Sequence, residues 1–308
     1  MSVKSSGHVT DVLNTEAISF LQQPRTQPFL LYLSHKAVHP ETLQRADGSL
    51  SDPNASTFVP AKRHEQLYTG VQVPRRPNAV APQNKPALQR QLLDLPPLGP
   101  DTGSTDESIL GRLRMLAGVD ESLGAILQQL EHLGELHRTL VVVTSDHGYF
   151  YGEHGLSVER RLAYEEAIRI PLLMRLPGVI KARSEPKEMA LTIDLAPSIL
   201  EIAGVDPLPT AQGRSLVPAL KGKSIDWRSE FLIEHFSDKV FPRMFDMGYQ
   251  SLRNERWKLI HYTDLRDMDE LYDLQSDPYE MKNLIGDPRS YEILESLRVR
   301  LNKLVLSL

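Results

Sequence analysis

The sequence predicts an α/β fold: a mostly parallel sheet flanked by helices, followed by a small C-terminal subdomain with an antiparallel sheet. Three observations predict it. Short apolar runs typical of strands buried on both faces occur at 28–34, 139–144 and 170–175. Helical patterns separate these runs, as in a sheet covered by helices. Towards the C-terminus, short segments alternate apolar and polar side chains instead.

The first half alternates helix and strand around a long irregular stretch. Apolar residues at helical spacing predict a helix over 9–22, with Thr10 as its cap. A second helical stripe begins at Gly111 and ends at Gly134. Between the two, the prolines of 41–106 exclude a regular helix, and a loop of this length is usually functional or disordered.

The second half continues the alternation and then changes character. Helical patterns at 160–167 and 194–204 flank the third apolar run. The amphipathic strands and the final helix expected after them lie at 230–235, 249–253, 257–262, 270–278 and 292–306. Such strands suit an antiparallel sheet with one face on a helix. We therefore divide the chain into an α/β core at 1–224 and a subdomain at 225–308.

Composition excludes several functions. The 35 basic and 40 acidic residues give a formal net charge of −5, so no basic excess favours nucleic acid or an anionic membrane. No apolar run approaches the roughly 18 residues of a membrane-spanning helix. The first residues lack the apolar core of a secretory signal peptide. The absence of cysteine excludes disulfides, thiolate metal ligands and cysteine nucleophiles.

The strongest local signal is Asp146-His147, directly after the apolar run at 139–144. Open α/β sheets bind ligands at the carboxyl ends of their strands. A carboxylate beside an imidazole there can hold a divalent metal. The alternative is an ordinary turn in which Asp146 accepts hydrogen bonds from backbone N–H groups.

Polar residues also follow the run at 28–34. His35, Lys36 and His39 are expected at the same edge of the sheet as Asp146. Cationic groups gathered there suit a tetrahedral oxyanion such as sulfate or phosphate. The alternative is a polar strand end that faces solvent.

A third cluster contains a tight turn and a charged segment. Gly152 and Gly155 bracket a glutamate and a histidine and allow a sharp excursion near the strand ends. Arg160 and Arg161 follow it. Tyr164 and the glutamate after it are interpreted as anchors for the next helix.

These segments together resemble the sulfatase family of the alkaline-phosphatase superfamily, over nearly the whole chain and in order. The sequences of these segments are most similar to those of the subgroup of N-acetylglucosamine-6-sulfatase-like enzymes that desulfate heparan and mucin sugars. The matching segments are 28–39 (PFLLYLSHKAVH), 119–124 (VDESLG), 144–148 (TSDHG), 152–156 (GEHGL), 164–172 (YEEAIRIPL), 194–198 (DLAPS), 212–216 (QGRSL), 253–258 (RNERWK) and 270–274 (ELYDL).

The resemblance implies a role for the cationic residues. His39 matches a histidine that contacts the substrate sulfate, and Arg160 stands near the place of a sulfate-binding lysine, in a segment one residue longer than usual. We expect His39, Lys36 and Arg160 to act in catalysis, and His39, His154 and Arg160 to bind substrate. The implied substrate is a sulfated carbohydrate, and the implied location is the periplasm or the outside of the cell.

The resemblance also implies a metal and a nucleophile. Asp146 and His147 match two late ligands of a divalent metal, usually Ca²⁺, whose other ligands are two early aspartates. The nucleophile is a formylglycine made from cysteine or serine in a Cys/Ser-x-Pro-x-Arg motif. This chain has no cysteine, and 51–55 (SDPNA) lacks the arginine. The sequence therefore resembles the C-terminal two-thirds of a sulfatase, with an incomplete metal site, and we expect it to be inactive alone.

Two other functions stay open at this point. A phosphodiesterase or phosphonate hydrolase of the same superfamily is compatible with Asp146-His147. The second possible function is that of a non-catalytic domain, which binds sulfated glycans through the same residues. The segments 34–39 and 270–274 favour a sulfatase.

Overall fold

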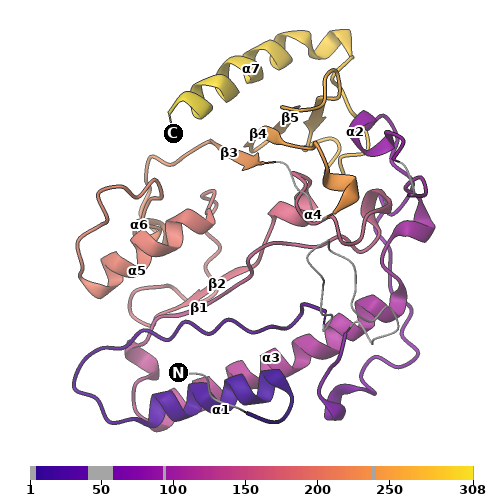
Figure 1. Cartoon of the computed structure of the whole chain (residues 1–308). Coiled ribbons are helices and arrows are strands. Elements are labelled where there is room, and N and C mark those ends of the chain that lie inside the picture. Colours follow the sequence, from indigo (N-terminus) through magenta and orange to yellow (C-terminus); the bar gives the residue numbers. More distant parts are fainter. Residues whose placement is uncertain (1–4, 41–57, 93–94, 237–240, 308) are drawn as a thin grey trace.

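The computed structural model describes residues 5–40, 58–92, 95–236 and 241–307. Two long helices, α1 (Val9–Gln22) and α3 (Asp106–His132), lie side by side along one edge of the molecule (Figure 1). Helix α1 has the predicted bounds. Thr10 is buried against its neighbours, however, and the residue that precedes the helix is His8, whose side chain makes no capping hydrogen bond.

A two-stranded sheet follows α3. Strand β1 (Val141–Thr144) pairs with β2 (Leu172–Arg175), and the pairing is antiparallel, with Val141 opposite Arg175. We expected parallel neighbours here. A parallel pair needs a crossover, usually a full helix, and the connection between β1 and β2 contains only a 3₁₀ turn (Glu153–Gly155) and the single turn of α4 (Glu165–Ile168).

The run at 28–34 is extended but pairs with no strand among the described residues. The predicted strand is therefore wrong as a sheet member. Its side chains explain the difference: Leu30 is 74% exposed and Tyr32 is 88% exposed. An apolar run forms a buried strand only where a neighbouring strand offers free backbone groups and a covered face.

The C-terminal region has the predicted architecture. Strands β3 to β6 form an antiparallel sheet in sequential order, and helix α7 lies across it (Figure 1). The bounds are β3 (Glu230–His235), β4 (Tyr249–Asn254), β5 (Trp257–Tyr262), β6 (Glu270–Asp273) and α7 (Tyr291–Leu306). The prediction of an antiparallel subdomain with a terminal helix is thus confirmed.

This sheet has an apolar core on each face. On one face, leucines of β4, β5 and β6 pack against Leu294, Leu297 and Leu301 of α7. On the other, tyrosines and Ile260 of the same strands pack against Phe150 and Tyr164 of the loop after β1. The second core therefore crosses the predicted boundary at 224/225 and joins the C-terminal sheet to the rest of the chain.

The remaining helices are short. The helix predicted over 160–167 forms only as α4, because the preceding residues make a turn instead. The predicted helix ends at Gly134 and Gly204 are confirmed, with φ angles of 70° and 68°. The other helices are α2 (Pro86–Gln89), α5 (Leu195–Ala203) and α6 (Val217–Leu220), with 3₁₀ turns at Lys62–His64, Pro100–Thr102, Leu136–Arg138, Glu153–Gly155, Thr192–Asp194, Pro242–Met244 and Pro288–Ser290. Within the described residues no helix has the length and apolarity to cross a membrane.

Candidate active site

The loop after β1 carries the two residues predicted to bind metal. The Asp146 side chain is 84% exposed, and its Oδ1 accepts a hydrogen bond from the backbone N–H of His147 at 3.0 Å. The Ser145 hydroxyl donates to the His147 carbonyl at 2.8 Å and closes the turn. Asp146 thus organises the local backbone while one face of its carboxylate points to solvent.

His147 is held by both ring nitrogens. Its Nδ1 lies 2.7 Å from the Gly148 carbonyl oxygen, which can only accept a hydrogen bond, so Nδ1 carries the proton. Its Nε2 then accepts a hydrogen bond from Arg160 Nε at 3.1 Å. In this geometry Arg160 occupies the Nε2 lone pair that a metal ion would use.

Asp146 and His147 do not by themselves make a calcium site. Calcium takes 6 to 8 oxygen ligands. In the part of the chain that the structure describes, no group of three or more histidine or acidic side chains is placed to hold a metal ion. The pair offers one carboxylate and one imidazole nitrogen, and that nitrogen is engaged by Arg160.

Arg160 joins this loop to the segment before α4. Burial lowers the pKa of its guanidinium, and the ring centroid of Phe241 lies 5.8 Å away. Among the described residues it forms no ion pair with a carboxylate. The structure thus brings Asp146, His147 and Arg160 together, as the sequence predicts.

His39 and Lys36 lie in the segment that ends before the undescribed residues 41–57. Both side chains are exposed, and His39 Nδ1 lies 2.9 Å from the Pro40 carbonyl oxygen. Within the described ranges no hydrogen bond or ion pair joins either of them to Asp146 or Arg160. Their part in a common site stays a prediction.

His154 lies inside the protein. It is 2% exposed, stacks on Tyr164 at 4.7 Å between ring centroids, and has Asn78 Nδ2 at 3.4 Å and Glu166 Oε2 at 4.0 Å from its Nε2. Burial drives the pKa of His154 well below its ordinary value, and Lys85 lowers it further. A substrate could reach this neutral ring only if the surrounding packing opened.

A buried ionic network that the sequence patterns do not indicate supports α4. Lys258 Nζ of β5 lies 2.8 Å from Glu165 Oε1 and 2.7 Å from Glu280 Oε1, and Lys258 has no exposed surface. Burial alone raises the pKa of Glu165, but Lys258 and Arg253 outweigh it and lower the pKa to about 2. Tyr164, beside Glu165, donates its hydroxyl hydrogen to Glu270 at 2.7 Å. Tyr164 and Glu165 therefore anchor α4, as interpreted.

One sequence signal could have revealed the network. Lys258 lies among the apolar residues of a strand, and a lysine buried there requires a counter-charge. Glu165 is one of two adjacent acidic residues at the start of a short helix. The sequence does not indicate that the side chains of Lys258 and Glu165 are in contact.

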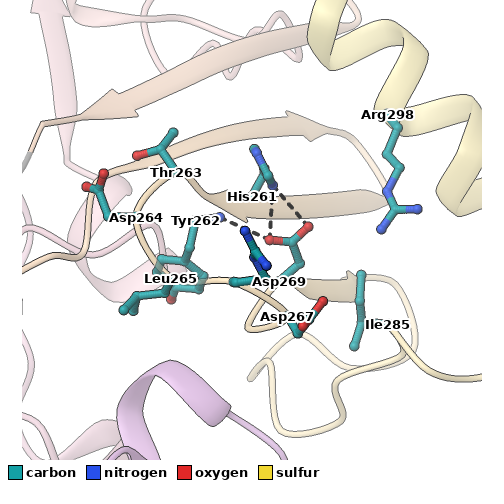
Figure 2. Close-up of a pocket in the computed structure, with 10 residues that line it drawn as sticks. His261, Tyr262, Thr263, Asp264, Leu265, Asp267, Asp269, Ile285 and Arg298 are labelled. Carbon is teal, nitrogen blue, oxygen red and sulfur yellow. Dashed lines mark hydrogen bonds and ion pairs between the residues drawn. The ribbon is translucent and has the colours of Figure 1, made fainter.

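A separate hollow of about 580 Å³ opens between the loop after β5 and α7 (Figure 2). His261 and Asp269 are in contact in its wall, with His261 Nδ1 at 3.0 Å from both carboxylate oxygens. Arg298 reaches towards it from α7 and is paired with Glu295 at 2.8 Å. None of the predicted site residues lines this hollow, and these charged groups are already paired.

Comparison with known proteins identifies the family. The family model described as Sulfatase matches residues 3–205, and the one described as N-sulphoglucosamine sulphohydrolase, C-terminal, matches residues 152–306. The chain belongs to the sulfatase family. The predicted resemblance, and with it the α/β class of the fold, is thereby confirmed.

Within the family, the chain is similar to sulfatases named for N-acetylglucosamine 6-sulfate. An N-acetylglucosamine-6-O-sulfatase of Bacteroides thetaiotaomicron is 39% identical over 178 residues, 56% of this chain and 31% of that protein. An N-acetylglucosamine-6-sulfatase of Bos taurus is 30% identical over 330 residues, 96% of this chain and 55% of that protein. The chain thus spans about one third to just over half of the length of these curated relatives.

A solved structure, of a protein in complex with its substrate D-glucosamine-2-N,6-O-disulfate, superimposes with a TM-score of 0.79 and 25% identity. The match covers 98% of this chain and 70% of that chain. The arrangement of helices and sheets described above is therefore that of a known fold.

Proposed function

We propose that this chain contributes part of the active site of a hydrolase that removes sulfate esters from sulfated amino sugars. Membership of the sulfatase family supports the reaction class, and the names of the relatives support the sugar. The observation that carries the proposal is the contact between Arg160 and His147 beside Asp146, at the end of β1.

The chemistry fits this group of residues. Hydrolysis of a sulfate ester places negative charge on the sulfuryl oxygens and on the leaving oxygen, and fixed cations stabilise that charge. An arginine offers a planar fork of N–H donors to such an oxyanion. We assign this role to Arg160, with Lys36 and His39 joining it from the segment after 28–34. We assign His154 a supporting role. Its buried ring packs on Tyr164 and holds in place the turn that precedes the segment with Arg160.

The finer parts of the proposal concern the nucleophile and the metal. A formylglycine nucleophile needs a cysteine or a serine in the Cys/Ser-x-Pro-x-Arg motif, and this sequence contains neither a cysteine nor that motif. Asp146 is the residue whose exposed carboxylate could serve as an oxygen ligand to a divalent ion, with calcium the expected metal. We propose that the 308 residues alone do not hydrolyse sulfate esters.

A hydrolysis assay tests this inactivity. We expect the purified chain to release no more product from an aryl sulfate, with calcium present, than its His39→Ala variant does. Release by the unmodified chain that clearly exceeds the variant would show that a nucleophile and a sufficient cationic site are present.

A binding assay tests the substrate class. We expect isothermal titration calorimetry to detect D-glucosamine 6-sulfate but not D-glucosamine, because the cations recognise the sulfate. Phenyl phosphonate serves as the comparison ligand: tighter binding of the phosphonate would favour a phosphonate hydrolase of the same superfamily. Equal heats for the sulfated and unsulfated sugars would contradict the proposal.

Two further expectations accompany this function. The division at 224/225 is proposed as a change of architecture rather than of folding unit, because one apolar core spans it. A location in the periplasm or outside the cell is proposed from the family resemblance, and cell fractionation would test it.

A further inference from the structure

Arg112 of α3 is a buried cation that has no counter-charge among the residues that the structure describes. The residue is 7% exposed, and within the described ranges it makes no hydrogen bond and no ion pair. Its Nε is fully buried without a partner, whereas its two terminal nitrogens, equally unbonded, keep contact with solvent. Buried arginines are normally paired, since an isolated buried charge is costly.

Aromatic rings surround this guanidinium but do not replace a counter-ion. Its central carbon lies 3.8 Å from the ring centroid of Tyr149, 5.3 Å from that of Phe58 and 5.8 Å from that of Tyr151. Stacking on Tyr149 fixes the plane of the guanidinium and leaves its edge free to donate hydrogen bonds. The side chain is thus preorganised for a planar, bidentate contact with an anion.

Arg112 lies beside the candidate active site. Tyr149, on which it stacks, follows His147 and Gly148 in the same loop. Arg160 lies close enough to Arg112 and Asp146 for their charges to act on it, and among the described residues Arg160 has no carboxylate paired with it either. Among the residues that the structure describes, the cluster therefore holds two arginines without a carboxylate partner, near the exposed carboxylate of Asp146. Glu159 also acts on Tyr149, but its carboxylate is paired with Arg243.

We propose that Arg112 and Arg160 together bind a tetrahedral oxyanion, and that Arg112 is a sulfate-binding residue of the active site. The excess positive charge, the free guanidinium edge and the nearby His147 carry this inference. The oxyanion chemistry follows from the geometry alone. Only the identification of the oxyanion as the sulfate of a sugar rests on the proposed function.

Inorganic sulfate is the probe that tests this site. The dissociation constant is measured by calorimetry with the full chain at constant ionic strength, with sodium chloride as the balancing salt. We expect Arg112→Met, which keeps the length of the side chain without its charge, to weaken sulfate binding by about tenfold or more, and Arg112→Lys to weaken it less.

Arg114 provides the matched control. It lies on the same helix, but its Nε donates to the Leu67 carbonyl and its Nη1 pairs with Glu107 at 2.6 Å. Arg114→Met should therefore leave sulfate affinity unchanged. Sulfate affinity of Arg112→Met equal to that of the unmodified chain, or no binding by the unmodified chain at millimolar sulfate, would overturn the proposal.

Thermal unfolding provides an independent readout. Removal of an unpaired buried charge should not lower the unfolding temperature of Arg112→Met without sulfate. Added sulfate should raise the unfolding temperature of the unmodified chain and not that of Arg112→Met. If the chain binds sulfate through Arg112 yet does not distinguish D-glucosamine 6-sulfate from D-glucosamine, the sugar specificity of the proposed function fails while the oxyanion site stands.

Discussion

The two sheets of this protein differ in how completely they are covered. In the C-terminal sheet, Leu252, Leu259 and Leu271 have no exposed surface and pack on α7. In the other sheet, the valines of β1 are only partly buried, and Leu173 of β2 is 64% exposed. No residue of β1 or β2 belongs to either apolar core found among the described residues.

The difference shows that an apolar strand does not make its own core. The runs that became β1 and β2 are as apolar as those of the C-terminal sheet, but burial requires a cover on each face. The C-terminal sheet is covered on both faces, on one by α7, which follows it in the chain, and on the other by the distant loop after β1. We infer that stability is concentrated in the C-terminal sheet, and three predictions test this.

The largest expected effect is at Lys258. Lys258→Met leaves the carboxylates of Glu165 and Glu280 buried without their shared cation, so we expect a loss of about 3 to 5 kcal/mol in the free energy of unfolding. Urea denaturation followed by circular dichroism measures it. The exposed Lys282 is the control, and Lys282→Met should change stability by less than about 0.5 kcal/mol. Equal effects of the two substitutions would contradict the importance of the network.

A matched pair of leucines compares the two sheets directly. Leu297 of α7 has no exposed surface, so Leu297→Ala should cost about 2 to 5 kcal/mol through lost burial and the cavity left behind. Leu173→Ala in β2 should cost no more than about 0.5 kcal/mol, because most of that side chain is already in water. Denaturant unfolding measures both, and a large loss for Leu173→Ala would show that β2 is better covered than described.

The smallest expected effect is a pH dependence at Glu280. Burial raises the pKa of its carboxyl to about 7, although Lys258 and Lys85 favour the charged form. The folded chain therefore holds a proton that the unfolded chain has released, and this contribution to stability is full below pH 4.5 and is lost as pH rises through about 7.

Glu280→Gln removes that titration. Between about pH 5 and about pH 8, we expect the unfolding temperature of Glu280→Gln to fall less than that of the unmodified chain. Thermal unfolding at several pH values measures the two slopes. Identical slopes would mean that Glu280 does not titrate in this range.

The sequence by itself determined the features whose signals are local. Helix α1, strands β3 to β5 and helix α7 lie where periodicity placed them, and Gly134 ends α3 because a left-handed residue stops a helix. Asp146, His147 and Arg160 were named together through the family resemblance; the structure shows Arg160 in contact with His147, and their role as a site stays a prediction.

Only the tertiary structure decided the features that depend on distant partners. These are the antiparallel direction of β1 and β2, the burial of His154, and two features of the described part of the chain: the run at 28–34 without a strand partner, and the contrast between the paired Lys258 and the unpaired Arg112. Strand pairing needs backbone groups supplied from elsewhere in the chain, and the protonation of a buried charge depends on which opposite charges the fold brings near it. The residues next to a strand or a buried charge predict neither the strand pairing nor the protonation, because both depend on segments far apart in the chain.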